Sequence, residues 1–148
     1  MDRDLTPAEV HAAASELAHS EGGRAYHIAM VLNGEAAIHI CFAGDISGSR
    51  TIKGEAGSWR GALANISAAV DGARAKRRAE TIRRMALKII DIADGAGTVS
   101  DRALRCEDFA PDEVSALSAE ACALANEMAG RGPFVVVRRG SSNHGAAA

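Results

Sequence analysis

The densest group of side chains that can do chemistry in this sequence is a run of cations. Seven of the chain's 17 Lys and Arg residues lie between Arg74 and Lys88, and Glu80 is the only acid among them. Cations along one face of a helix neutralise the phosphates of a nucleic acid, and the released counterions add affinity. The segment therefore predicts a surface for an anionic macromolecule, either a nucleic acid or an acidic protein surface. The residues assigned to this surface are Arg74, Arg77, Arg78, Arg84 and Lys88.

Charge along the chain is strongly segregated. The formal charge is −4 for residues 1–58, +6 for 59–90, −7 for 91–130 and +3 for 131–148. Two further interpretations of the cations therefore stay open: a solvated helix face, or neutralisation by the acidic segment of the same chain. In the alternative function, a protein–protein module such as an inhibitor or antitoxin-like protein, the acids themselves bind the partner. Those acids are Glu107, Asp108, Asp112 and Glu113.

Histidine and cysteine offer a weaker signal. His39 and Cys41 are two residues apart in an expected strand, so they share a face as a pair of metal ligands does. The three cysteines are widely spaced and form no CxxC motif, which argues against a disulfide framework and a zinc site. We therefore expect no metal, no cofactor and no catalytic residues. An enzyme stays the third possibility if His27, His39 and Cys41 converge with a carboxylate.

Two other segments lack the residues that a nucleotide or DNA site needs. The Gly-rich stretch 44–58 has neither a Gly-Lys-Ser/Thr ending nor a dinucleotide fingerprint, so we interpret it as turns. Segments 100–104 and 111–128 have the spacing of a helix–turn–helix. However, the second begins with Asp112 and Glu113, which would repel DNA phosphates. A packed helical hairpin is the better interpretation.

Local patterns in the sequence predict the helix and the strands that precede the basic segment. Thr6 and Glu9 form a capping box that predicts a helix over 7–21. Asn33-Gly34 favours a two-residue turn joining strands 24–32 and 35–43. That turn would pair Val31 with Ala36, Ala29 with Ile38, and His27 with Ile40. Both faces of the hairpin are largely apolar, so we expect the sheet to be covered on both sides or by a second subunit.

The cations fall where a long helix changes its apolar face. Ser58 predicts a cap for a helix starting at Trp59, whose first apolar stripe ends near Gly72. The stripe that follows lies almost opposite the first. A straight helix would be apolar early and basic late on one side, so we expect either a break near Gly72 or a passage from one core into another.

Residues 25–66 resemble the strand–loop–helix of HicB-like antitoxins, small proteins that bind a toxin and often DNA. The resemblance rests on Phe42, the segment 45–48, Thr51, Gly54 and the segment 62–65. This chain lacks a proline after Phe42 and has a longer loop and an additional N-terminal helix. The order helix–strand–strand–strand–helix is also similar to a double-stranded RNA-binding domain, with the basic helix start reduced to Arg60.

The sequence thus predicts an α+β fold: an N-terminal helix, a small antiparallel sheet of three to four strands, a long, broken basic helix and a C-terminal helical hairpin. Residues 1–72 would hold the helix and hairpin core. Residues 73–140 would hold the helices and a terminal strand at 134–138, packed with the first part as one domain, and 141–148 a disordered tail. No apolar run is long enough to cross a bilayer. We expect a non-catalytic cytoplasmic regulator or adaptor, forming a homo-oligomer, with an anionic partner and no membrane.

Overall fold

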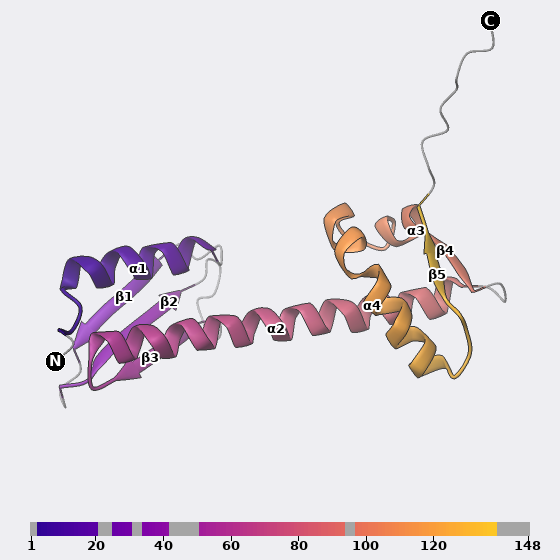
Figure 1. Ribbon diagram of the computed structural model, residues 1–148. Coiled ribbons are helices and arrows are strands. Elements are labelled where there is room, and N and C mark those ends of the chain that lie inside the picture. Colours follow the sequence, from indigo (N-terminus) through magenta and orange to yellow (C-terminus); the bar gives the residue numbers. More distant parts are fainter. Residues whose placement is uncertain (1–2, 21–24, 31–33, 42–50, 94–96, 139–148) are drawn as a thin grey trace, which may run out of the picture. The chain divides into compact units, whose positions relative to one another are not determined.

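The computed structural model describes residues 3–20, 25–30, 34–41, 51–93 and 97–138. It contains both helices and strands, with a small antiparallel sheet and one long helix (Figure 1). Two compact units divide the chain, residues 1–75 and residues 76–148. Helix α2 (Trp59–Ile92) contributes its first half to the core of one unit and its second half to the core of the other. The division expected from the sequence, at residue 72 within one packed domain, stays a prediction.

Helix α1 (Pro7–Ser20) begins at the predicted capping box. The Thr6 hydroxyl donates to the Glu9 carboxylate over 2.7 Å, and the backbone N–H of Thr6 donates to the same oxygen over 2.7 Å. These bonds satisfy groups that a helix start otherwise leaves without partners. The face that α1 buries carries Val10, Ala14 and Ala18.

Strands β1 (Ala25–Met30), β2 (Ala36–Cys41) and β3 (Thr51–Ala56) pair antiparallel in the order β1–β2–β3. The predicted register of the first pair is wrong by one residue. His27 lies opposite His39, and Ala29 lies opposite Ala37. A two-residue turn at 33–34 requires the other register, so the turn that the sequence favoured does not set the pairing. A shift of one residue exchanges the faces of a strand.

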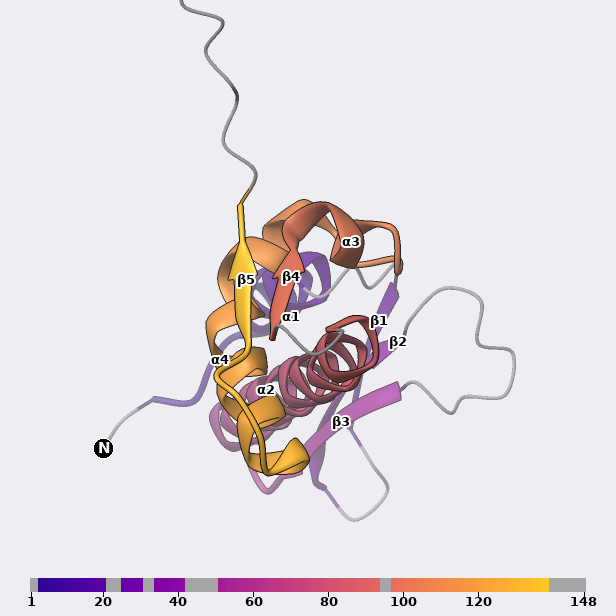
Figure 2. The same cartoon turned by 90° about the vertical axis from the view of Figure 1, so that its right-hand side faces the viewer.

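Helices α1 and α2 cover the same face of this sheet, as Figure 2 shows. Ile38 and Ile40 of β2 pack with Val10 and Ala14 of α1 and with Ile66 of α2. Gly54 of β3 permits this contact, because a Cβ there would lie 2.4 Å from the carbonyl oxygen of Ala62. The opposite face of β2 and β3 carries no helix among the described residues. Ala37 on that face is nonetheless buried. The expectation of a sheet covered on both sides, or by a second subunit, stays a prediction.

Helix α2 passes Gly72 without interruption, so the predicted break there is wrong. The alternative prediction is confirmed, because the helix leaves one core and enters a second. Its first stripe, Ala62, Ile66 and Val70, belongs to the first unit. Its second stripe, Met85, Ala86, Ile89 and Ala93, belongs to the second unit. Ser58 caps the helix start as predicted, accepting a bond from the N–H of Gly61 over 3.1 Å.

The second unit packs two short strands and two helices against the second half of α2. They are β4 (Thr98–Ser100), α3 (Asp101–Arg105), α4 (Pro111–Ala129) and β5 (Val135–Val137). Leu104, Phe109, Val114 and Phe134 fill the core with Met85 and Ile89. β5 pairs in parallel with β4 and not with the first sheet, which corrects the expectation of a fourth strand there. Ser100 caps α3 and Gly130 ends α4 in the left-handed conformation, both as the sequence predicts.

Within the residues that the structure describes, no helix combines the length and the apolar character needed to cross a bilayer. The predicted tail at 141–148 lies outside the described residues, as do residues 44–50 of the Gly-rich stretch. The interpretation of 44–58 as turns is wrong for residues 51–56, which form β3.

Candidate functional site

Three of the five predicted anion-binding cations are engaged within the second unit. The clearest is Arg78, whose guanidinium donates to both carboxylate oxygens of Glu120 on α4, one of them at 2.7 Å. This hydrogen bond is the main reason that the pKa of Glu120 is lowered and the pKa of Arg78 is raised. Both side chains are about half exposed, so the pair fixes geometry more than it stabilises the fold.

Lys88 and Arg84 have partners on the segment between α3 and α4. The Lys88 ammonium lies 2.7 Å from the Glu107 carboxylate, and that bond raises the pKa of Lys88. The Arg84 guanidinium lies 4.9 Å from the centroid of the Phe109 ring, a cation–π contact. Phe109 itself is buried in the core. We call Arg78, Arg84 and Lys88 the inner cations, because they join α2 to the rest of its unit.

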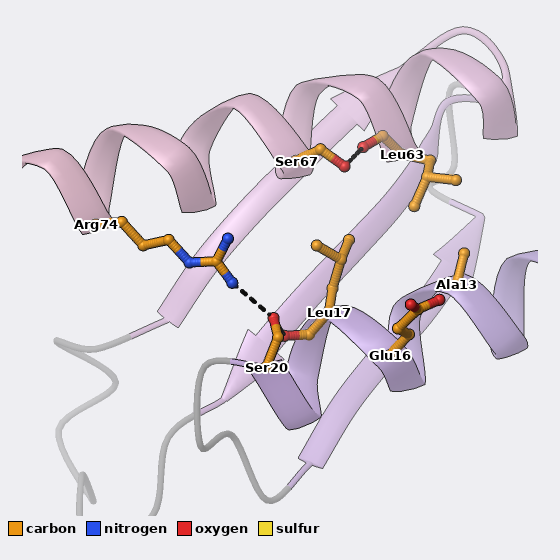
Figure 3. A pocket seen from close by; sticks show the side chains of 7 residues that line it. All are labelled: Ala13, Glu16, Leu17, Ser20, Leu63, Ser67 and Arg74. Carbon is orange, nitrogen blue, oxygen red and sulfur yellow. Dashed lines mark hydrogen bonds between the residues drawn. The ribbon is translucent and has the colours of Figure 1, made fainter.

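Arg74 belongs to the first unit and lies beside a groove between α1 and α2. Its guanidinium donates to the Ser20 hydroxyl over 2.9 Å and lies 3.6 Å from the Asp71 carboxylate. Figure 3 shows the side chain extending across the groove toward the end of α1. The groove, of about 360 Å³, is lined by Ala13, Glu16, Leu17, Ser20, Leu63, Ser67 and Arg74. The contacts assign Arg74 a role in joining the two helices.

The remaining cations lie on the solvent face of α2. Lys76 and Arg83 are exposed, and no ion pair or hydrogen bond of either side chain is found among the described residues. Arg77 is also exposed, but unlike Lys76 and Arg83 its side chain interacts with another group of the protein. At 100° per residue, Lys76, Glu80, Arg83 and Leu87 form one narrow stripe on the helix, opposite its buried face. We call these four residues the outer stripe. Leu87 is 50% exposed.

The predicted acidic site is also partly used inside the fold. Glu107 pairs with Lys88, and Glu113 accepts the N–H of Ala110 over 3.0 Å at the start of α4. Asp108 and Asp112 are exposed. A groove of about 470 Å³ between α2 and the start of α4 brings the two predicted sets together. It is lined by Arg77, Arg78, Thr81, Asp112, Glu113, Ala116 and Leu117. Its mixed charge favours neither a simple anion nor a simple cation.

The side chains of His27 and Cys41 lie outside the described part of the structure, so the expectation of no catalytic residues stays a prediction. Cys106 is exposed, whereas Cys122 is buried and its pKa is raised by that burial. Among the described residues, no group of three His, Cys, Asp or Glu side chains is arranged to hold a metal ion. His39 has one acidic neighbour, Glu55, with 3.5 Å between Nε2 and a carboxylate oxygen. Glu55 carries no signal of this contact in the sequence, because the proximity of His39 and Glu55 depends on the pairing of β2 with β3.

The start of α2 has a second capping group besides Ser58, and the sequence did not predict it. The Asp4 carboxylate accepts the N–H groups of Trp59 at 3.1 Å and Arg60 at 3.0 Å. A partner 55 residues away leaves no local signal in the sequence.

No protein-family model, curated protein or solved structure matches the chain. The similarity of residues 25–66 to HicB-like antitoxins and to double-stranded RNA-binding domains therefore stays a resemblance.

Proposed function

We propose that this protein is a non-catalytic adaptor or regulator that binds an acidic protein surface through the outer stripe of α2. One observation carries the proposal: the cations of the basic segment separate into two sets. Arg78, Arg84 and Lys88 contact groups of their own unit, while Lys76 and Arg83 are presented to solvent. Charge that the fold does not use is available to a partner.

The composition of the outer stripe favours a protein over a nucleic acid. Leu87 follows Arg83 by four residues and is 50% exposed, which adds an apolar contact next to the two cations. A helix that presents residues at i, i+4, i+7 and i+11 matches the way helices dock into partner grooves. Glu80 lies within the stripe and would repel phosphates, whereas a protein partner can supply a donor for it.

Charge reversal tests the proposal. In the Lys76→Glu/Arg83→Glu double variant we expect the loss of a partner that the wild-type protein captures from its host extract and that binds again after purification. Arg102→Glu is the matched control, because Arg102 is an exposed cation on α3 outside the stripe. Far-ultraviolet circular dichroism confirms that each variant is folded. Retained binding in the double variant, or equal loss in Arg102→Glu, contradicts the proposal.

Nucleic-acid binding is the second candidate, favoured by the exposure of Lys76, Arg77 and Arg83 on one helix. Fluorescence anisotropy with labelled duplex DNA and RNA at low and moderate salt measures it. Contacts with three phosphates would give a slope of log K against log salt of about −2 to −3. Binding of this kind, abolished by the same double variant in the absence of any protein partner, would replace our proposal with the nucleic-acid function.

A further inference from the structure

The groove between α1 and α2 combines apolar side chains with two exposed charges. Leu17 of α1 and Leu63 of α2 line it, and both are only partly buried where they pack against the core of the first unit. Glu16 and Arg74 also line it and are exposed. Its volume of about 360 Å³ falls within the range of about 300–1,000 Å³ that small-molecule sites occupy. The groove thus has the size and the composition of a site for a small amphipathic molecule.

The two charges of the groove have opposite sign. The Arg74 guanidinium donates to the Ser20 hydroxyl and lies 3.6 Å from the Asp71 carboxylate. Asp71 is 75% exposed, so its contact with Arg74 is weak. The Glu16 carboxylate has no hydrogen bond or ion pair with any of the described residues. Glu16 would repel a simple anion and Arg74 would repel a simple cation, whereas a zwitterion is complementary to both.

The spacing of the charges indicates the length of the zwitterion. Glu16 precedes Ser20, the hydrogen-bond partner of Arg74, by four residues, which is about one helical turn, or about 5–6 Å between Cβ atoms. In Figure 3, Leu17 lies between the two charged side chains. An extended chain spans at most about 3.3–3.6 Å per residue, so the terminal charges of a dipeptide are up to about 7 Å apart. Those of a single amino acid are about half as far apart, so a dipeptide matches the groove better.

We propose that this groove binds a free dipeptide that carries an apolar side chain. The carboxylate of the ligand pairs with the Arg74 guanidinium, whose planar N–H donors match the geometry of a carboxylate. The ammonium of the ligand pairs with Glu16, and its apolar side chain covers Leu17 and Leu63. This inference concerns the first unit and is independent of the function proposed for the outer stripe of α2.

Titration of the isotope-labelled full-length protein with the dipeptide Ala-Leu, followed by nuclear magnetic resonance, tests the site. We expect saturable shifts of the amide signals of residues 13–20 and 63–74. Glu16→Gln and Arg74→Gln should each weaken binding about fivefold, as the loss of an exposed charge pair does at most. Lys76→Gln is the matched control, because Lys76 is an exposed cation on the same helix outside the groove, and it should bind as the wild type does.

Capped peptides identify the end of the ligand that each charged residue holds. N-acetyl-Ala-Leu lacks the ammonium, so it should bind the wild type about fivefold more weakly than Ala-Leu, but bind Glu16→Gln as well as Ala-Leu does. Ala-Leu amide lacks the carboxylate and should show the same relation with Arg74→Gln. Leucine alone should bind more weakly than Ala-Leu, because its charges are closer together.

Glu16→Gln changes only an exposed side chain, so it serves even if Arg74→Gln disturbs the contact between the two helices. The proposal is overturned if the wild-type protein shows no saturable binding of Ala-Leu, or if Glu16→Gln leaves that binding unchanged. Equal weakening by Lys76→Gln, or binding of leucine as tight as that of Ala-Leu, overturns it as well.

Discussion

Replacing Gly54 with alanine tests the closest approach between the first sheet and α2. The new Cβ would lie 2.4 Å from the carbonyl oxygen of Ala62 and 2.5 Å from the backbone nitrogen of Ile66. Both atoms belong to the helix backbone, so no side-chain rotation relieves the clash. Either β3 or α2 must move, and that movement disturbs Ile38 and Ile66, which are both fully buried.

The magnitude follows from the cost of overpacking. Forcing a methyl group into a packed core costs about 1–3 kcal/mol, and backbone obstacles place this site at the upper end, about 3 kcal/mol. The melting temperature should fall by about 6–12 °C if the whole chain unfolds together, and by about 12–24 °C if the first unit unfolds alone.

Thermal unfolding followed by far-ultraviolet circular dichroism measures the effect. Gly57→Ala is the matched control, because a Cβ at Gly57 meets nothing within 4 Å. If Gly54→Ala melts within about 2 °C of Gly57→Ala, a shift smaller than the smallest expected one, then the packing described for this unit is incorrect.

Three further changes give distinct outcomes. Gly72→Ala places a better helix former in open space at the centre of α2, so urea unfolding should show a gain of about 0.5–1 kcal/mol; a loss would indicate that the helix is interrupted there. Asp4→Asn removes a carboxylate whose pKa is lowered, chiefly by the bond from the Arg60 N–H and further by that from Trp59. A lowered pKa contributes stability above the usual value of 3.8 that is lost as the pH falls through the lower folded value. Unfolding measured from pH 6 down to pH 2 should therefore show a shallower acid loss in this variant than in the wild type, and equal slopes would argue against the cap. Phe109→Ala should cost about 3–5 kcal/mol because the ring is buried, while Arg84→Ala should cost about 0.5–1 kcal/mol; chemical denaturation that shows equal costs would contradict the assigned contact.

Local signals in the sequence were sufficient for the helix ends. The capping box at Thr6, the caps at Ser58 and Ser100, and the left-handed residue at Gly130 act through bonds to residues no more than a few positions away. Such signals are therefore legible without tertiary structure. The change of apolar stripe along α2 was legible too, because helical periodicity directly reports which face is buried.

The errors concern contacts between residues far apart in the chain. Asn33-Gly34 favoured one register of β1 against β2, and the structure has another, shifted by one residue. Gly72 favoured a helix break, but packing of both halves of α2 outweighs the modest cost of one glycine. The cost to a helix of a single Gly, about 1 kcal/mol, is small beside the apolar surface that each half buries.

In the candidate site, too, local features were predictable and contacts between distant residues were not. Counting charges identified the basic segment, yet it could not separate the inner cations from the outer stripe. Glu120 and Phe109, which engage Arg78 and Arg84, lie on segments 25 or more residues away. Their positions depend on how α4 and the preceding segment pack against α2. Lys76 and Arg83 were not among the five cations that the sequence favoured for the binding surface, and they are the two that we now propose for it.

Site-specific cross-linking from the outer stripe tests the central claim most directly. A photoreactive amino acid in place of Leu87 should link the protein to a partner peptide rich in Asp and Glu, identified by mass spectrometry. The link should disappear when Lys76→Glu and Arg83→Glu are added. The same photoreactive residue in place of Ala119, an exposed position on α4, should not form it. Equal cross-linking from both positions, or a link from Leu87 that survives charge reversal, would contradict the assignment of α2 as the binding surface.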